Sequence, residues 1–237
     1  MNATIMRLSA QALFGRRRGS MMLVIPLILL ALALIVRLLT EPGTAYTEIV
    51  GELGRDLALP LVALLAATAV LGPEVDDGSI VYLLAKPVNR YGVALSKYVV
   101  ALVAVLGFGA LPVLLAGLIN DAGNPGTAVA MLAGAVLAAV AYTALFLALC
   151  AFTRHAVVVG LLFVFLWEGA VGNLLDGVRW LSVSAWARDI AAALSDRIDE
   201  AAPVGTAYAL VAALVVVVGG IVFAGWRLST FSLTGET

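Results

Sequence analysis

Six long apolar runs divide this chain, and they limit its fold more than any other feature of the sequence. The runs cover residues 21–39, 57–71, 93–119, 127–152, 156–175 and 208–226. A helix needs roughly 20 apolar residues to cross the hydrocarbon core of a bilayer. Because backbone groups in lipid must bond within the chain and strand-like alternation is absent, the runs predict six transmembrane helices. In the short second run, Pro60 and Pro73 are typical of a helix start and stop.

The composition supports a single membrane domain. Hydrophobic residues make up 63% of the 237 residues and charged residues only 12%, whereas a soluble domain has roughly 45–50% and about 25%. No polar stretch is long enough to fold as a second domain. We therefore expect residues 1–237 to form one all-α transmembrane domain with the lipid bilayer as its solvent.

Several function classes are disfavoured by what the sequence contains. Cys150 and His155 are the only residues of their kinds, so an internal disulfide and a His/Cys metal cluster are excluded. The net charge of −1 argues against a nucleic-acid partner. The phosphate-binding pattern GxxxxGK[ST] does not occur, and no nucleophile–base pair suggests a catalytic site. A polytopic membrane enzyme is therefore a weak hypothesis.

The basic residues indicate how the chain crosses the membrane. An even number of spans puts both ends on one side, and that side holds most of the Lys and Arg, with Arg16, Arg17 and Arg18 directly before the first run. Basic flanks favour the cytoplasmic side. We expect both termini and residues 72–97 to be cytoplasmic in a multi-pass protein of the cell membrane. The high Ala, Val and Gly content suggests a bacterial cytoplasmic membrane.

The N-terminal region leaves two alternatives open. Residues 4–18 place Ile5 and Leu8 on one helical face, which predicts an interfacial helix on an anionic leaflet; the alternative is a basic tail that only sets topology. The small-residue triplet at 31–33 imitates a secretory cleavage site. The apolar run continues to Leu39, which favours a retained span over a cleaved signal.

Glu168 is the acidic residue that lies well inside an apolar run. An intramembrane carboxylate is costly and suggests a functional site. With nearby Asn173 it is a candidate to line a transport pathway, to contact a cationic group of a substrate, or to titrate. The alternative is a protonated or locally paired side chain. Further along, Ser184 can cap a short helix in which Trp186, Ile190 and Leu194 share a face.

Residues 72–97 form a charged unit between the second and third runs, with their own helix start and stop signals. Ser79 can cap a helix, and Asp77 places negative charge near the positive end of that helix. Lys86 suits the C-terminal end, and Pro87 prevents continuation. We expect Lys97, at the start of the third run, to extend along its stem to the cytoplasmic membrane surface. The pattern predicts a short helix on the membrane surface, with apolar side chains available to dock into a groove on a partner.

At these residues the sequence resembles a known family. The resemblance is carried by Glu74, Asp77-Gly78-Ser79-Ile80, Leu83-Leu84-Ala85-Lys86-Pro87-Val88-Asn89-Arg90 and Lys97. In this order they resemble the signature of ABC-2 type permeases, the membrane subunits of one class of ATP-binding-cassette (ABC) transporter. The layout of that family also resembles this chain: an N-terminal interfacial helix, six spans, a coupling helix between spans two and three, and short re-entrant or interfacial helices before span six.

The resemblance implies that a separate ABC ATPase subunit drives this chain. The ATPase uses ATP and Mg²⁺, this chain binds no cofactor of its own, and closure of the ATPases moves the coupling helix and switches access to the pathway. The implied contact residues are Glu74, Asp77, Gly78, Ser79, Leu83, Leu84, Lys86 and Arg90. A second permease copy is implied as well, in a homodimer or with a homologous permease. The implied function is export; an ATPase-independent channel or scaffold is the alternative.

Overall fold

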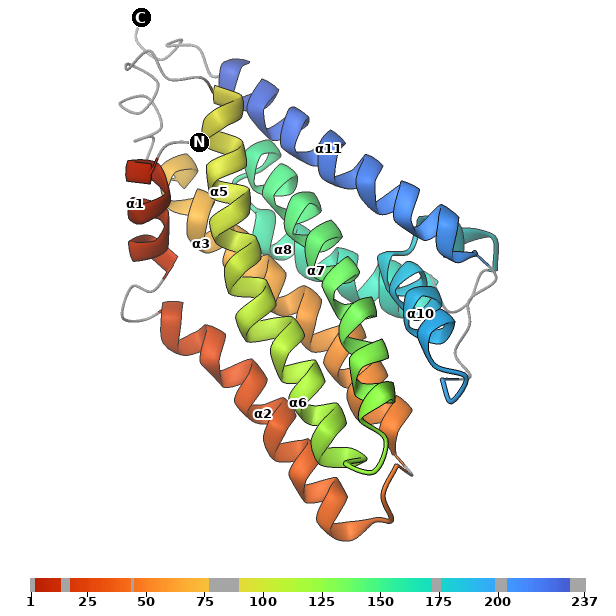
Figure 1. Cartoon of the computed structure of the whole chain (residues 1–237). Helices are drawn as coiled ribbons and strands as arrows, with labels where there is room; N and C mark the ends of the chain where they lie inside the picture. Colours follow the sequence, from red (N-terminus) through yellow and green to blue (C-terminus); the bar gives the residue numbers. More distant parts are fainter. Residues whose placement is uncertain are drawn as a thin grey trace, which may run out of the picture.

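The computed structural model describes residues 3–13, 18–43, 45–76, 90–171, 176–198 and 204–230. Within these ranges every regular element is a helix (Figure 1). The elements are α1 (Ala3–Leu13), α2 (Arg18–Leu39), η1 (Thr47–Ala58), α3 (Leu59–Asp76), α5 (Arg90–Val105), η2 (Leu106–Ala110), α6 (Leu111–Asn120), α7 (Pro125–Phe152), α8 (Ala156–Leu162), η3 (Phe163–Val171), η4 (Asp176–Leu181), α10 (Val183–Leu194) and α11 (Thr206–Thr230). The wider π-helical stretches η1, η2 and η3 adjoin α-helices, and η4 is a 3₁₀-helix.

The helices confirm the all-α membrane fold. Among the described residues, five helical stretches are long and apolar enough to cross a bilayer: Met22–Leu39, Thr47–Leu71, Arg90–Asn120, Pro125–Phe152 and Thr206–Leu228. The remaining apolar stretch, Ala156–Gly169, is shorter than these. The count of six spans therefore stays a prediction.

The second span begins earlier than the sequence predicts. The predicted span starts at 57, with Pro60 in its first turn, but the helix begins at Thr47 because η1 runs directly into α3. Pro60 lies at the junction where the π-helical turns give way to α-helix. A junction of this kind tolerates a residue that has no N–H to donate. As a result, Arg55 and Asp56 lie inside a helix and not in a loop.

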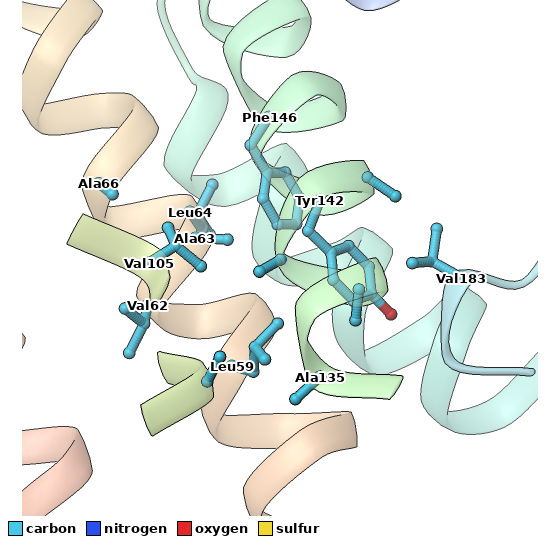
Figure 2. Packing of buried hydrophobic residues seen from close by; sticks show 14 of the residues in the cluster. Leu59, Val62, Ala63, Leu64, Ala66, Val105, Ala135, Tyr142, Phe146 and Val183 are labelled. Atoms are coloured by element: carbon cyan, nitrogen blue, oxygen red, sulfur yellow. The ribbon is translucent and has the colours of Figure 1, made fainter. Parts of the chain in front are cut away.

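The core is organised around α7, which packs against α3, α6, α10 and α11. Small residues on α7 allow this: a Cβ at Gly134 would overlap the carbonyl oxygen of Ala187 in α10. On the other side, Figure 2 shows the rings of Tyr142 and Phe146 beside Leu59 and Leu64 of α3. The two rings stack with their centroids 5.8 Å apart. Close backbone approach through small residues is the usual way helices associate in lipid.

Helices at the periphery leave apolar side chains exposed. Most of the apolar window of α2 and of α11 lies outside the packed interior, as expected for helices whose outer face meets lipid. α1 packs against α3 and α5 (Figure 1). Leu8 is exposed while Leu13 at the end of α1 is fully buried. The predicted N-terminal helix is confirmed as a helix; its place on a membrane surface stays a prediction.

Candidate functional site

Two groups of charged residues lie at opposite ends of the helices. The first, called the polar cluster, joins η1, η3 and the start of α10 and consists of Arg55, Asp56, Glu168, Ser182, Ser184 and Arg188. The second, called the neck, lies where the last turns of α3 and α11 meet the first turns of α5 and consists of Val70, Arg90, Tyr91, Lys97, Gly225 and Leu228.

In the polar cluster, Glu168 holds the N-terminus of α10. Its side chain is 4% exposed. The hydroxyl of Ser182 donates to Oε2 at 2.6 Å and that of Ser184 at 2.8 Å. The backbone N–H of Val183 donates to Oε1 at 2.9 Å, and that of Ser184 makes a longer contact of 3.4 Å with Oε2. First-turn N–H groups lack helical partners and favour negative charge, so the carboxylate stabilises this helix start.

Asp56 ties η1 to α10 in the same cluster. The Arg55 guanidinium donates to its two carboxylate oxygens at 2.8 and 3.2 Å. Arg188 Nε lies 3.4 Å from Asp56 Oδ2, and Arg188 Nη2 donates to Ser184 Oγ at 3.3 Å. The Ser184 hydroxyl thus connects Arg188 to Glu168. Two anions and two cations meet in one network, which keeps the net charge of this buried region near zero.

A cavity of about 280 Å³ adjoins the polar cluster. It is lined by the apolar side chains of Leu57, Val164 and Phe165, by Thr47, Glu52 and Gly169, and by the cluster members Asp56, Glu168, Ser184 and Arg188. Such a cavity can take a small group with polar and apolar parts. Among the described residues, no three His, Cys, Asp or Glu side chains are arranged to hold a metal ion.

The structure decides between some of the alternatives for Glu168. Its carboxylate accepts hydrogen bonds from local serines and backbone, so the locally paired arrangement is the one observed. It also lines the cavity, and its role in a pathway stays a prediction. Asn173 lies outside the described residues. Sequence reasoning missed Arg55, Asp56 and Arg188; the adjacent Arg-Asp pair directly before an apolar run was the available signal.

One local prediction for α10 was wrong. The N-cap is Ser182, whose Oγ accepts from the N–H of Ala185 at 3.2 Å, and Ser184 lies in the first turn instead. Trp186 is buried, and its Nε1 donates to a backbone carbonyl of η4. Leu194, at the end of the helix, is 61% exposed. The buried side of α10 also carries Ser184 and Asp189, because Glu168 and the backbone of Gly205 provide polar partners there.

At the neck, two cations donate to helix carbonyls. Lys97 was expected to extend along its stem to the membrane surface, but it is 1% exposed and its Nζ donates to the carbonyl of Val70 at 2.7 Å. The α3 carbonyl gives this ammonium a partner inside the protein, so it need not reach water. Arg90 Nη1 donates to the carbonyl of Leu228 at 3.1 Å. These bonds join α5 to α3 and to α11.

The predicted ATPase contacts lie mainly outside the part of the chain that the structure describes. Those outside it are Asp77, Gly78, Ser79, Leu83, Leu84 and Lys86. Glu74 lies in the last turns of α3, and Arg90 is the first residue of α5. The predicted coupling helix therefore stays a prediction, and what the structure gives is the arrangement of the helices on either side of it.

The family of this chain follows from comparison of its sequence with known protein families. The sequence model that describes the ABC-2 family of transporter proteins matches residues 17–173. The matched range includes η1, α3, the Arg90 and Lys97 side of the neck, and Glu168. A comparison with curated proteins found no match. The family match covers most of the chain and confirms the resemblance seen at residues 72–97, and we conclude that the chain belongs to the ABC-2 family of transporter proteins.

Proposed function

We propose that this chain is the membrane-spanning permease subunit of an ABC exporter, driven by a separate ATPase. The observation that carries the proposal is the family match over residues 17–173, since membership makes the chain a membrane transport component and implies pairing with an ABC ATPase. The ATPase binds ATP and Mg²⁺, and it moves the coupling helix within residues 72–97. Both termini and this segment face the cytoplasm.

The arrangement of the helices supports this proposal. Residues 77–89 connect α3 to α5, whose ends are bonded to each other and to α11 at the neck. The polar cluster and its cavity lie at the other end of the helices, where α10 packs against α7 and α11. A transporter that alternates its access needs force delivered at one end and a change in packing at the other. A second copy, or a homologous permease, completes the pathway and covers part of the exposed apolar surface.

Co-purification tests the proposed partner directly. The chain is co-expressed with an ABC ATPase subunit from the same genome and purified in detergent, as wild type and with Leu83→Asp and Leu84→Asp together. We expect the wild type to retain the ATPase and the double variant to lose it, because charge in place of the Leu pair prevents docking in an apolar groove. Failure of the wild type to capture an ATPase would favour an ATPase-independent channel or scaffold.

The control must carry the same charge change elsewhere on the same side. Arg154 lies in an exposed turn between α7 and α8, at the end of the helices that we propose to be cytoplasmic. Arg154→Asp, which lowers the net charge by as much as the two Leu substitutions together, should leave ATPase capture unchanged. Equal loss in the control and in the double variant would show a general charge effect and count against a specific coupling helix.

A further inference from the structure

We propose that Arg90, Tyr91, Gly225 and Leu228 form a clamp that fastens the start of α5 to the end of α11, so that α11 follows any movement delivered through residues 77–89. The inference rests on the proposed function, because the movement comes from the ATPase. It assigns Arg90 a positioning role toward α11 inside the permease, in addition to the ATPase contact that the family resemblance implies.

The hydrogen bond of the clamp uses a carbonyl at a helix end. Leu228 lies in the last turn of α11, where backbone carbonyls have no partner within the helix. The Arg90 guanidinium donates to this carbonyl at 3.1 Å, and Leu228 itself is 3% exposed. A cation at the negative end of a helix forms a charge-assisted bond, which is strong where water is excluded. The first residue of α5 is therefore fixed to the end of α11.

The packing of the clamp depends on a glycine. Gly225 lies one turn before Leu228, and a Cβ there would lie 2.5 Å from Cδ1 and 3.2 Å from Cα of Tyr91. Such distances are too short for a side chain, so only glycine lets the Tyr91 ring lie directly on α11. At Gly219 in the same helix nothing lies within 4 Å of the corresponding position. Figure 1 shows the start of α5 meeting the end of α11.

The position of the clamp makes it a point of force transmission. Residues 77–89 end where Arg90 begins α5, and two turns further along Lys97 is bonded to α3. At the far end of α11, the Tyr208 hydroxyl donates to the carbonyl of Trp180 at 3.0 Å, and the two rings meet edge to face at 4.9 Å. The N–H of Gly205 donates to Asp189 of α10 at 2.7 Å. Movement of α11 therefore reaches the helix that Glu168 holds.

The test reads movement at the far end of α11 in the complete complex. Cys150, the chain's single cysteine, is replaced by Ala, and Ala207, exposed at the start of α11, is replaced by Cys. The complex with the ABC ATPase is placed in nanodiscs, and the rate at which Cys at 207 reacts with a polar maleimide is measured without nucleotide and with ATP and Mg²⁺. We expect a several-fold ATP-dependent change in this background.

Variants at Gly225 then isolate the clamp without changing an implied ATPase contact. Gly225→Leu should still capture the ATPase and hydrolyse ATP but weaken the ATP-dependent change in labelling, because its side chain would displace the Tyr91 ring, whereas Gly219→Leu should keep the change because nothing lies near that position. A full ATP-dependent change in Gly225→Leu, or no change in the background protein, would overturn the clamp. Absence of ATPase capture by the background protein would instead overturn the proposed function, and the inference with it.

A disulfide across the clamp tests it without removing the cation. Tyr91→Cys with Gly225→Cys, in the Cys150→Ala background, removes the ring and places two thiols where the backbones nearly touch. If α5 and α11 move as one body, oxidation to the disulfide leaves ATP-dependent labelling at position 207 unchanged from the reduced protein. Loss of the response on oxidation, restored by reductant, would show that the helices must separate and would contradict the clamp.

Discussion

The polar cluster and the neck both hold charged side chains inside a membrane protein, and they do so by different means. In the cluster, the carboxylates of Asp56 and Glu168 meet guanidinium groups, hydroxyls and the N–H groups of a helix start. At the neck, the cations of Arg90 and Lys97 donate to carbonyl oxygens of neighbouring helices. The cluster brings side chains of opposite charge together, and the two hydrogen bonds described at the neck each run from a cation to a helix backbone.

This difference predicts how each region responds to substitution. Removing a carboxylate from the cluster leaves several buried donors without their acceptor, and each such donor costs about 1–3 kcal/mol. Removing Lys97 from the neck leaves the carbonyl of Val70, which lies inside α3, and it also removes the cost of burying a charge. The cluster should therefore govern stability, while the neck should govern how movement passes between helices.

Loss of the Asp56 carboxylate should have the largest effect. Asp56→Leu removes the anion that contacts Arg55, which is 1% exposed, and also the ion pair to Arg188. Breaking a buried ion pair by removing one partner costs about 3–5 kcal/mol. We expect a marked fall in thermal stability of the protein in nanodiscs, followed by intrinsic tryptophan fluorescence. Glu48→Leu, at an exposed position of η1, is the control, and equal losses in the two variants would contradict the prediction.

Glu168→Gln should destabilise the protein less. The amide keeps the size of the carboxylate, but its NH₂ group faces donors that at present reach Oε1 and Oε2. Hydrogen bonds to a charged group contribute about 1.5–3 kcal/mol, and Gln preserves part of that. The same thermal measurement applies, with Glu48→Gln as control. Unchanged stability would mean that Glu168 does not hold α10, and a direct role in the cavity would then become the better explanation.

The two regions also differ in how well they could be predicted from the sequence. Long apolar runs predict spans because the bilayer sets helix length, and five of the stretches were confirmed. Glu168 could be identified as a candidate because a carboxylate inside such a run is unusual. Its hydrogen-bond partners could not be identified from the sequence, because Ser182 is fourteen residues away along the chain and the pairing depends on tertiary packing.

The errors have physical causes as well. The second span was predicted from the proline rule, but a π-helical stretch precedes Pro60, and no local pattern indicates it. Lys97 was placed at the surface because lysine usually reaches water along its stem. The carbonyl of Val70 that it meets lies 27 positions earlier in the chain. The acceptors of Lys97 and Arg90 described here are backbone carbonyls, which every residue has. The identity of the accepting residue therefore gives no hint of the bond, and the neck is the harder region to predict.

A packing change at the neck should have an intermediate effect. Gly225→Leu would force a side chain into the Tyr91 ring, and overpacking of this kind costs about 1–3 kcal/mol. Gly219→Leu is a matched control in the same helix, because nothing lies near that position. We expect a lower unfolding temperature and a weaker ATP-dependent response for the first variant alone. If both variants behave like the wild type, α5 and α11 are not in close contact at this point.

Lys97→Met should change the stability of the protein less than the other three substitutions. It therefore tests most sharply whether the cluster and the neck have different roles. Methionine keeps the length of the buried stem and removes the charge, so the loss of hydrogen bonds such as that to Val70 is partly offset by the lost desolvation cost, and the net change should be about 1 kcal/mol. Thermal unfolding measures this change, and the ATP-dependent labelling at position 207 measures the movement. The hydrogen bond from α5 to α3 is nevertheless lost, so the labelling response should fall. A large loss of stability would mean that the neck, like the cluster, depends on a charge for its fold, and the division between a stabilising region and a transmitting region would fail.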